Sequence, residues 1–449
     1  MIPVIVYLHA HDSGRAIQPY GYPVATPHLQ TFADDAVMFR NAFAAAPGCS
    51  PSRSALLTGA PPHVNGVIGL AHRGFPLVRK QWHLAHQLRE MGYRTVICGM
   101  QHVWEGDQSL VGYTDDVRPR NLNAEFVLPR AIEALEQAVS AGQPLFLDVG
   151  FEEAHRPYHT AAPGEADHVK PPFQFPDVPE IRQDIADMQT SLKVFDSSAG
   201  ELFAAMKRLG VYDDAFILVT TDHGLPMPGM KCSLSVYGTG VFLIVRGPQG
   251  SAYRGGQALD AVVTQMDVLP TLYELSGWEP QPWFHGRSLT PLLNGAESIH
   301  DAIFGEITFH ATWEPTRSIR TQDWLLIHHI GAPYRRAMCN VDEGPTREAL
   351  EQRGWPWDPV FPEVELYDLT RDPAEQHNVA HSGYAQDVKV ALLDRLHRWM
   401  METSDPFITA SWAIPDEARM NRLESTSASE ELIHPDEELD FSFQPPGRR

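Results

Sequence analysis

The stretch Cys49-Ser50-Pro51-Ser52-Arg53-Ser54-Ala55-Leu56-Leu57-Thr58-Gly59 reads as the start of a short helix, and the rest of the chain is organised around it. Its proline fixes φ, Ser52 or Ser54 can cap the helix, and the Ala-Leu-Leu run propagates it. The Cys49 side chain is therefore expected at a helix N-terminus, where unpaired N–H groups favour negative charge. Arg53, one turn later, adds a fixed cation. This combination suits the handling of an oxyanion, although a lone cysteine before a helix is by default a buried structural residue.

Length and composition indicate one large α/β domain with a smaller one. The chain has 449 residues, of which 43% are hydrophobic and 10% aromatic, enough for a substantial core. Its net charge of −22 argues against nucleic acid, anionic membranes and long polyanions as partners. An anionic substrate then needs a local cationic pocket, which favours a small molecule or a chain end.

The cysteines and the first residues bear on the compartment. Beside Cys49 there are Cys98, Cys232 and Cys339, an odd number without metal-ligand spacing, so no disulfide framework is expected. The opening residues lack a basic n-region and a cleavage site, and no apolar run reaches transmembrane length. We expect a cytoplasmic enzyme, or a periplasmic one if a signal peptide has been removed.

Two apolar runs end in polar residues that are typical of a functional site. Residues 4–8 are expected to form a central parallel strand that ends before His11 and Asp12, and residues 216–221 a second that ends at Asp222 and His223. Ligands gather beyond the carboxyl ends of such strands. A carboxylate followed by an imidazole is a credible half of a metal site. The alternative for Asp12 is a capping role in a turn.

Further candidates lie on loops that follow other buried segments. The alternative to a role in the site is a solvent-facing side chain, which is the usual position of a lysine. They are His72, Arg73, His102, His155, Arg156, Lys231 and His310.

The Cys49–Gly59 stretch resembles the signature of the sulfatase family, whose members have an alkaline-phosphatase-like fold. The resemblance covers nearly the whole chain, and it is greatest to heparan N-sulfatase (sulfamidase) and related bacterial sulfatases. It also rests on Thr26-Pro27-His28-Leu29, Phe39-Arg40-Asn41-Ala42-Phe43 and Glu402-Thr403-Ser404-Asp405-Pro406-Phe407. It implies that Cys49 is converted to Cα-formylglycine before folding, which requires a formylglycine-generating enzyme. In the family one hydroxyl of the hydrated aldehyde attacks sulfur and the other later expels sulfate.

The resemblance also implies one divalent metal. Its ligands would be Asp12, Asp222, His223 and an oxygen of modified Cys49. The family usually has two adjacent aspartates here. Asp12 matches the second, and His11 stands in place of the first. His11 is therefore a further ligand or supports the other ligands. Calcium is the family's metal, whereas two imidazoles fit manganese or zinc better.

The same resemblance assigns roles around the sulfate. Arg53 and the metal would neutralise charge, and His102 would position the diol and take a proton from it. His155 and Lys231 would contact the sulfate and assist the leaving group. Met100 stands in place of a family lysine, so that contact is absent or comes from Arg73 or Arg156. The loops around His72 and His310 would shape specificity.

The implied fold is a large mixed, mostly parallel sheet sandwiched by helices, over residues 1–315. A small antiparallel α+β subdomain is expected over residues 316–414, with a hairpin at 317–328 and a closing helix at 388–401. Residues 415–449 are acidic and are expected to form an arm over a neighbouring surface or to be partly disordered.

The resulting prediction is an enzyme that hydrolyses a sulfate monoester or sulfamate in a small sulfated molecule or sulfated sugar. One alternative is a phosphonate or phosphate ester hydrolase of the same superfamily, suggested by Asp222-His223 and by Met100. Another is an inactive binding homologue in which Cys49 stays a thiol. A homo-oligomer is possible.

Overall fold

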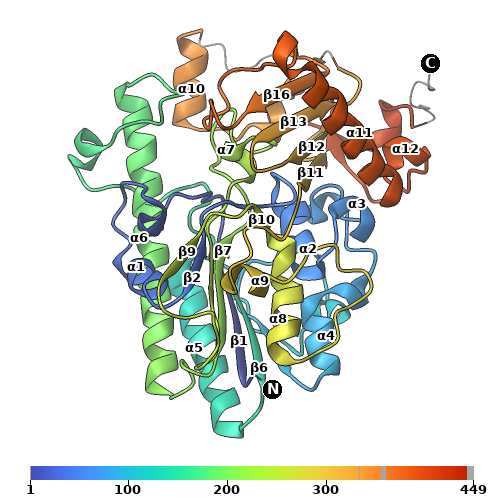
Figure 1. The fold of residues 1–449 in the computed structure, drawn as a ribbon. Helices are drawn as coiled ribbons and strands as arrows, with labels where there is room; N and C mark the ends of the chain where they lie inside the picture. The colour runs from blue at the N-terminus through green and yellow to red at the C-terminus, as the bar shows by residue number, and fades with distance from the viewer. Residues whose placement is uncertain (1, 333, 355–359, 442–449) are drawn as a thin grey trace.

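The computed structural model describes residues 2–332, 334–354 and 360–441, and its larger part is built on one eight-stranded sheet (Figure 1). The strand order is β5-β4-β6-β1-β7-β8-β2-β9. The pairs from β5 to β7 are parallel, whereas β8 runs antiparallel to both of its neighbours. The strands are β1 (Val4–Ala10), β2 (Val37–Phe39), β4 (Arg94–Ile97), β5 (Asp115–Asp116), β6 (Leu145–Gly150), β7 (Phe216–Thr221), β8 (Leu243–Arg246) and β9 (Gln257–Leu259).

Helices cover both faces of this sheet, because the side chains of β1 alternate between two cores. Val4, Val6 and Leu8 pack with α1 (Pro27–Ala33), α5 (Ala124–Ala141) and α6 (Pro179–Arg208). Ile5 and Tyr7 pack with α2 (Cys49–Thr58), α4 (Leu84–Glu90) and α8 (Val268–Ser276). The predicted sandwich of a mixed, mostly parallel sheet between helices is confirmed.

A second, antiparallel sheet lies above the first (Figure 1). It has the order β11 (Ile303–Phe309), β12 (Trp313–Arg320), β13 (Trp324–His329) and β16 (Val364–Asp368), and it packs on α11 (Gln386–Glu402). The predicted hairpin and closing helix are confirmed. The boundary expected before residue 316 falls inside β12, and the sheet already begins at Ile303.

Shorter elements complete the described chain. Within 415–441, Ala418, Met420 and Ile433 are buried against Phe75 and Phe309, so this part is an arm over the body; residues 442–449 lie outside the described residues. None of the helices in the described ranges is long and apolar enough to cross a membrane. The short elements are β3 (Ala42–Phe43), α3 (Pro62–Asn65), α7 (Val236–Thr239), β10 (Val263–Thr264), α9 (Thr290–Leu293), β14 (Tyr334–Arg335), α10 (Pro345–Gln352), β15 (Val360–Phe361), α12 (Pro406–Thr409), β17 (Met420–Asn421) and β18 (Leu432–Ile433).

Candidate active site

Cys49 is the first residue of α2, as expected from the sequence, but the predicted serine cap is wrong. The N-cap is Gly48, which has extended backbone and makes no side-chain cap. The Ser52 hydroxyl instead donates to the carbonyl of Asp222 at 2.5 Å, and the Ser54 hydroxyl donates to that of Pro51. A tertiary contact therefore outcompetes the local cap and ties α2 to the end of β7.

The Cys49 sulfur is buried and faces the carboxyl end of the central strands. Its Sγ lies 3.3 Å from Nε2 of His223. Burial raises the pKa of the Cys49 thiol well above its ordinary value, and this outweighs the nearby charge of Lys231. The unmodified side chain is therefore a neutral thiol and a weak nucleophile.

Two buried carboxylates lie next to Cys49, one from each central strand. Because β1 pairs with β7 in parallel, with Ala10 opposite Thr221, the residues that follow these strands emerge side by side. The Asp12 backbone N–H donates to Asp222 Oδ1 at 2.9 Å. Asp12 has a φ of 50°, a left-handed conformation that turns the chain at this point.

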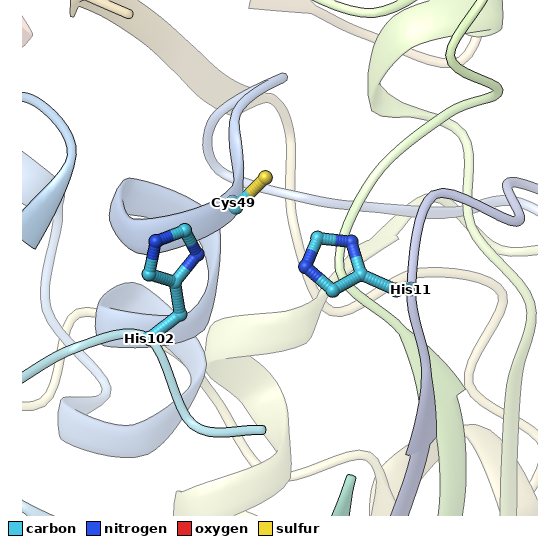
Figure 2. Close-up of side chains that lie close together, drawn as sticks. All are labelled: His11, Cys49 and His102. Atoms are coloured by element: carbon cyan, nitrogen blue, oxygen red, sulfur yellow. The ribbon is translucent and has the colours of Figure 1, made fainter. Parts of the chain in front are cut away.

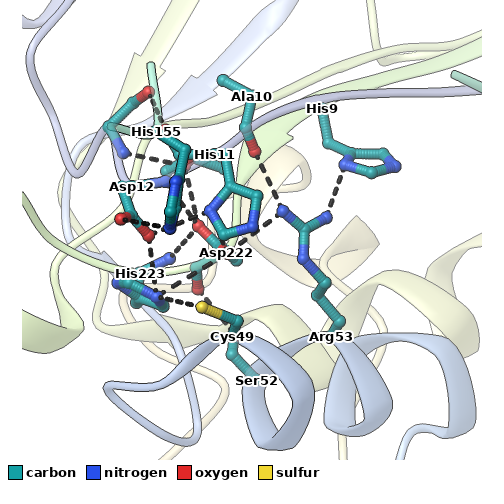
Figure 3. A network of polar contacts seen from close by, with 12 residues as sticks. His9, Ala10, His11, Asp12, Cys49, Ser52, Arg53, His155, Asp222 and His223 are labelled. Atoms are coloured by element: carbon teal, nitrogen blue, oxygen red, sulfur yellow. Dashed lines mark hydrogen bonds and ion pairs between the residues drawn. The ribbon is translucent and has the colours of Figure 1, made fainter. Parts of the chain in front are cut away.

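Two imidazoles close the carboxylate pair from opposite sides (Figure 3). His11 Nδ1 lies 2.9 Å from Asp12 Oδ1 and 3.2 Å from Asp222 Oδ2. His223 Nε2 lies 3.1 Å from the same oxygen of Asp12. Burial lowers the pKa of His11 to about 4, so its ring is neutral at pH 7 and can accept a metal ion.

Two buried cations contact the outer oxygens of these carboxylates. Arg53 Nη2 donates to Asp222 Oδ2 at 3.0 Å, and Lys231 Nζ donates to Asp12 Oδ2 at 2.9 Å and to Asp342 Oδ2 at 3.0 Å. Burial alone would raise the pKa of Asp12, but Lys231 and the histidines hold it well below its usual value. Burial alone would lower the pKa of Lys231, yet Asp12 and Asp342 hold it well above its usual value.

The donor set fits a divalent cation. Ligand atoms of His11, Asp12, Cys49 and Asp222 all lie within 4.8 Å of one another. Three carboxylates, counting Asp342, face the two cations Arg53 and Lys231, which leaves one negative charge without a counter-charge. A bound metal ion would neutralise that charge.

Histidines line the other side of Cys49 (Figure 2). The rings of His11 and His102 face each other beside the sulfur, and ligand atoms of all three residues lie within 4.8 Å of one another. His102 has a φ of 56°, and its Nε2 lies 2.7 Å from Nδ1 of His72, whereas its Nδ1 is buried without a partner. His72 thus orients His102 toward the nucleophile position.

His155 and His310 also lie at the site. The His155 ring lies 4.7 Å from that of His11, and its Nε2 lies 3.8 Å from Asp12 Oδ2. The His310 ring lies against Gly48, and both of its nitrogens are buried without a hydrogen-bond partner. Burial and the charge of Lys231 lower the pKa of His310 well below its ordinary value, so a neutral imidazole faces the site.

Arg73 and Arg156, the two arginines expected to replace the family lysine, have partners away from Cys49. Arg73 donates to the Ala311 carbonyl at 2.9 Å and to Asn421 Oδ1 at 2.8 Å, and so holds the C-terminal arm. Arg156 makes two hydrogen bonds of 2.6 Å to Asp184 on α6. Met100 brings no charge, so Arg53 and Lys231 are the cations that lie beside Cys49 in the part of the chain that the structure describes.

Sequence reasoning missed a buried relay behind Arg53. Arg53 Nη1 lies 2.5 Å from His9 Nδ1, and His9 Nε2 lies 2.9 Å from Asp148 Oδ1. Asp148 also accepts a hydrogen bond from the Tyr113 hydroxyl. A carboxylate inside the apolar strand β6 was the available signal, because a fully buried aspartate needs a partner. The relay fixes the position of Arg53.

Sequence missed Asp342 as well. It lies on an irregular segment before α10, where no strand end or motif marks it.

Comparisons with known proteins identify the family. The Sulfatase family model matches residues 3–278. Human (Homo sapiens) N-sulphoglucosamine sulphohydrolase is 29% identical, over 91% of this chain and 92% of the relative.

Two solved structures share the fold. One is a protein in complex with its substrate D-glucosamine-2-N,6-O-disulfate, with 17% identity, a TM-score of 0.71, and coverage of 90% of this chain and 99% of that chain. The other is a phosphonate monoester hydrolase of Agrobacterium radiobacter, with 18% identity, a TM-score of 0.69, and coverage of 94% and 100%. The family match spans more than half of the chain and includes Cys49, Arg53 and both central strand ends, so the chain belongs to the sulfatase family.

Proposed function

We propose that this protein hydrolyses a sulfate monoester or sulfamate, with position 49 as its nucleophile. The observation that carries the proposal is the placement of Cys49 beside Asp12, Asp222 and the two cations. The buried thiol is protonated, so the unmodified residue would attack sulfur poorly. Converted to formylglycine by a formylglycine-generating enzyme, the residue would supply a hydrated aldehyde as the attacking group.

One divalent metal is the expected cofactor. Asp12, Asp222, His11 and His223 would hold it, together with an oxygen of the modified residue 49. When bound, it supplies Lewis-acid stabilisation of charge on the sulfuryl oxygens. The family's metal is calcium, whereas a set of two carboxylates and two imidazoles suits manganese or zinc.

The protein side chains have distinct tasks in this reaction. Arg53 and Lys231 bind the sulfuryl oxygens, because Arg53 Nε is buried without a partner and Lys231 uses only two of its three N–H donors on carboxylates. His102, oriented by His72, accepts a proton at Nδ1 from the group at position 49. His155 donates a proton to the leaving atom, and His310 hydrogen-bonds the leaving group.

The names of the relatives and the net charge support one class of substrate. The human relative is named for N-sulphoglucosamine, and one structure of the same fold holds a sulfated glucosamine. Together with the net charge of −22, this favours a small sulfated molecule or sulfated sugar over a long polyanion.

A phosphonate or phosphate ester hydrolase is the second candidate, favoured by Met100 in place of the family lysine. A phosphonate monoester hydrolase has the same fold. Parallel rates on matched sulfate and phosphate monoesters separate the two, and we expect kcat/KM to be higher on sulfate.

The decisive experiment is the mass of the tryptic peptide that contains residue 49, from protein made together with a formylglycine-generating enzyme. A loss of about 18 Da, the thiol-to-aldehyde change, is expected in active protein. Active protein with an unmodified thiol would contradict the mechanism. Fully converted protein that is inactive on a panel of sulfate esters and sulfamates would contradict the activity.

A further inference from the structure

The carboxylates of Asp342 and Glu152 lie on the water-facing side of the site. One side chain stands between each of them and Oδ2 of Asp12. Lys231 Nζ lies 2.9 Å from that oxygen and 3.0 Å from Asp342 Oδ2. His155 Nε2 lies 3.8 Å from the same oxygen, and Glu152 Oε1 lies 3.7 Å from His155 Nδ1. Side-chain exposure rises from 0% at Asp12 to 23% at Asp342 and 29% at Glu152. Asp342 and Glu152, which we call the rim, therefore lie on the more exposed side of the site.

The basic side chains described near this rim are already engaged. Arg53 and Lys231 are bonded to the carboxylates of the site. Arg73 and Arg156 donate to groups away from Cys49. Because the single charge of Lys231 is shared between Asp12 and Asp342, the Asp342 carboxylate is only partly neutralised and disfavours a leaving group that carries additional anions.

A buried, unpartnered side chain near Lys231 is available to bind a ligand at the site. His310 is 8% exposed, yet neither ring nitrogen has a partner. Its ring is so close to the nucleophile segment that a Cβ on Gly48 would lie 3.2 Å from His310 Cδ2. Lys231 is near enough to lower the pKa of His310. Buried polar groups are normally satisfied, so His310 is poised for a hydrogen bond with the substrate.

We propose that Asp342, which is bound to Lys231, together with Glu152, which lies next to His155, selects substrates whose leaving group carries or acquires a positively charged nitrogen. The proposal rests on the proposed sulfatase activity and names its substrate class. Lys231 uses two of its three N–H donors on Asp12 and Asp342 and offers the third to the sulfate. A sulfate bound there places its leaving group next to the Asp342 carboxylate.

This selection serves sulfamates as well as ammonium-bearing sulfate esters. In sulfamate hydrolysis the S–N bond breaks, and water supplies one oxygen to sulfur and two protons to nitrogen. The products are R–NH₃⁺ and SO₄²⁻, so the nitrogen gains a positive charge as it leaves. The carboxylates of Asp342 and Glu152 stabilise that charge, whereas a sugar with a second sulfate at the rim is disfavoured.

The test is a pair of isosteric substrates that differ in one charge. Choline O-sulfate carries a quaternary nitrogen, and 3,3-dimethylbutyl sulfate has carbon at that position. We expect kcat/KM to be at least about tenfold higher for choline O-sulfate than for the neutral ester. This ratio corresponds to the attraction between the quaternary nitrogen and one nearby carboxylate at intermediate dielectric. Asp342→Asn should lower this ratio about tenfold. A change in kcat/KM for the neutral ester measures any displacement of Lys231, because that ester has no positive charge.

A matched control and a binding measurement keep the outcome unambiguous. Asp260→Asn removes an exposed carboxylate that pairs with Arg40, and it should leave the ratio unchanged. Calorimetric binding of both esters to Cys49→Ser protein measures the same selectivity without turnover. A ratio near one, or a ratio that Asp342→Asn does not change, would overturn the proposal. If neither ester is hydrolysed, the binding ratio still decides it, and the missing turnover counts against the proposed function alone.

Discussion

The eight-stranded and the four-stranded sheet each carry a buried cluster of metal-ligand side chains, and the clusters differ in how cations are arranged around their carboxylates. At the large sheet, Asp12 and Asp222 lie with His11 beside Cys49. At the antiparallel sheet, ligand atoms of His63, Glu306 and Asp405 lie equally close together. Ligand type and spacing therefore do not distinguish the two clusters.

The cation that the chain itself supplies does distinguish them. Arg317 lies between the carboxylates of the second cluster, with Nε 2.6 Å from Asp405 Oδ2 and 3.5 Å from Glu306 Oε2. Its Nη1 also donates to the carbonyl of Ile307. In the second cluster one guanidinium thus bridges both carboxylates. In the first cluster Arg53 and Lys231 bind different carboxylates, and the sulfur of Cys49 lies beside them.

The largest expected effect is at the cluster beside Cys49. Asp222→Asn should lower kcat/KM at least about a thousandfold, because it removes a metal ligand and the partner of Arg53. Bound metal measured by mass spectrometry should fall with it. Glu306→Gln, the matched change in the other cluster, should leave metal content unchanged. Equal metal loss in both variants would show that the clusters are not distinct.

Chelation sharpens the comparison from the ligand side. Dialysis against a chelator should abolish turnover and lower Tm, because a metal that binds only the folded chain stabilises it. Manganese or zinc should restore activity at lower concentration than calcium, since two imidazoles are softer donors than carboxylates. Recovery with calcium alone would assign His11 a supporting role.

At the cluster bridged by Arg317 the expected effect is on stability. Arg317→Met should lower the free energy of unfolding by about 3–5 kcal/mol, because it leaves Asp405 and Glu306 buried without their cation. Urea denaturation measures this, and kcat/KM of the remaining folded enzyme should change little. Arg40→Met, which breaks an exposed pair, should cost less than about 1 kcal/mol.

A smaller loss is expected where the arm is attached. Arg73→Ala removes hydrogen bonds to Ala311 and Asn421 and should cost about 1–3 kcal/mol. Amide exchange should accelerate over residues 415–441. Unchanged exchange there would mean that apolar packing alone holds the arm.

The smallest effect is a pH dependence of the structural network. Burial alone would raise the pKa of Asp405, but Arg317 and His63 hold it below its usual value. A depressed folded-state pKa contributes stability above the unfolded pKa, about 3.9, and that stability is lost as the pH falls below it. The stability difference between wild type and Arg317→Met should therefore shrink as the pH falls below about 4. A difference that is constant with pH would place the effect in packing.

The elements that local patterns specify were predictable from the sequence. The apolar run at residues 4–8 and the helical spacing over residues 181–209 correspond to β1 and the single helix α6. Candidates at strand ends, such as Asp12 and Asp222, were found because parallel strands bring their carboxyl ends to one edge.

The contacts that were missed join residues that are distant in sequence. His9 and Asp148 are 139 positions apart, and no local pattern relates them. Ser52 was assigned a capping role, but its hydroxyl bonds to Asp222 instead. Asp342 lies on irregular backbone, where periodicity carries no information. Tertiary geometry, not propensity, decides these partners.

The attachment of the arm to Arg73 has a consequence for the timing of biosynthesis. Residues 421 and 428, which accept from Arg73, leave the ribosome more than three hundred residues after Cys49. Arg73 is adjacent to His72, which orients His102. The segment with His72 and Arg73 therefore gains its hydrogen bonds to the arm only late in synthesis. A modifying enzyme that requires an unfolded Cys49 segment would benefit from this delay. The last segment of the described chain would then mark the end of the period in which the nucleophile can be made.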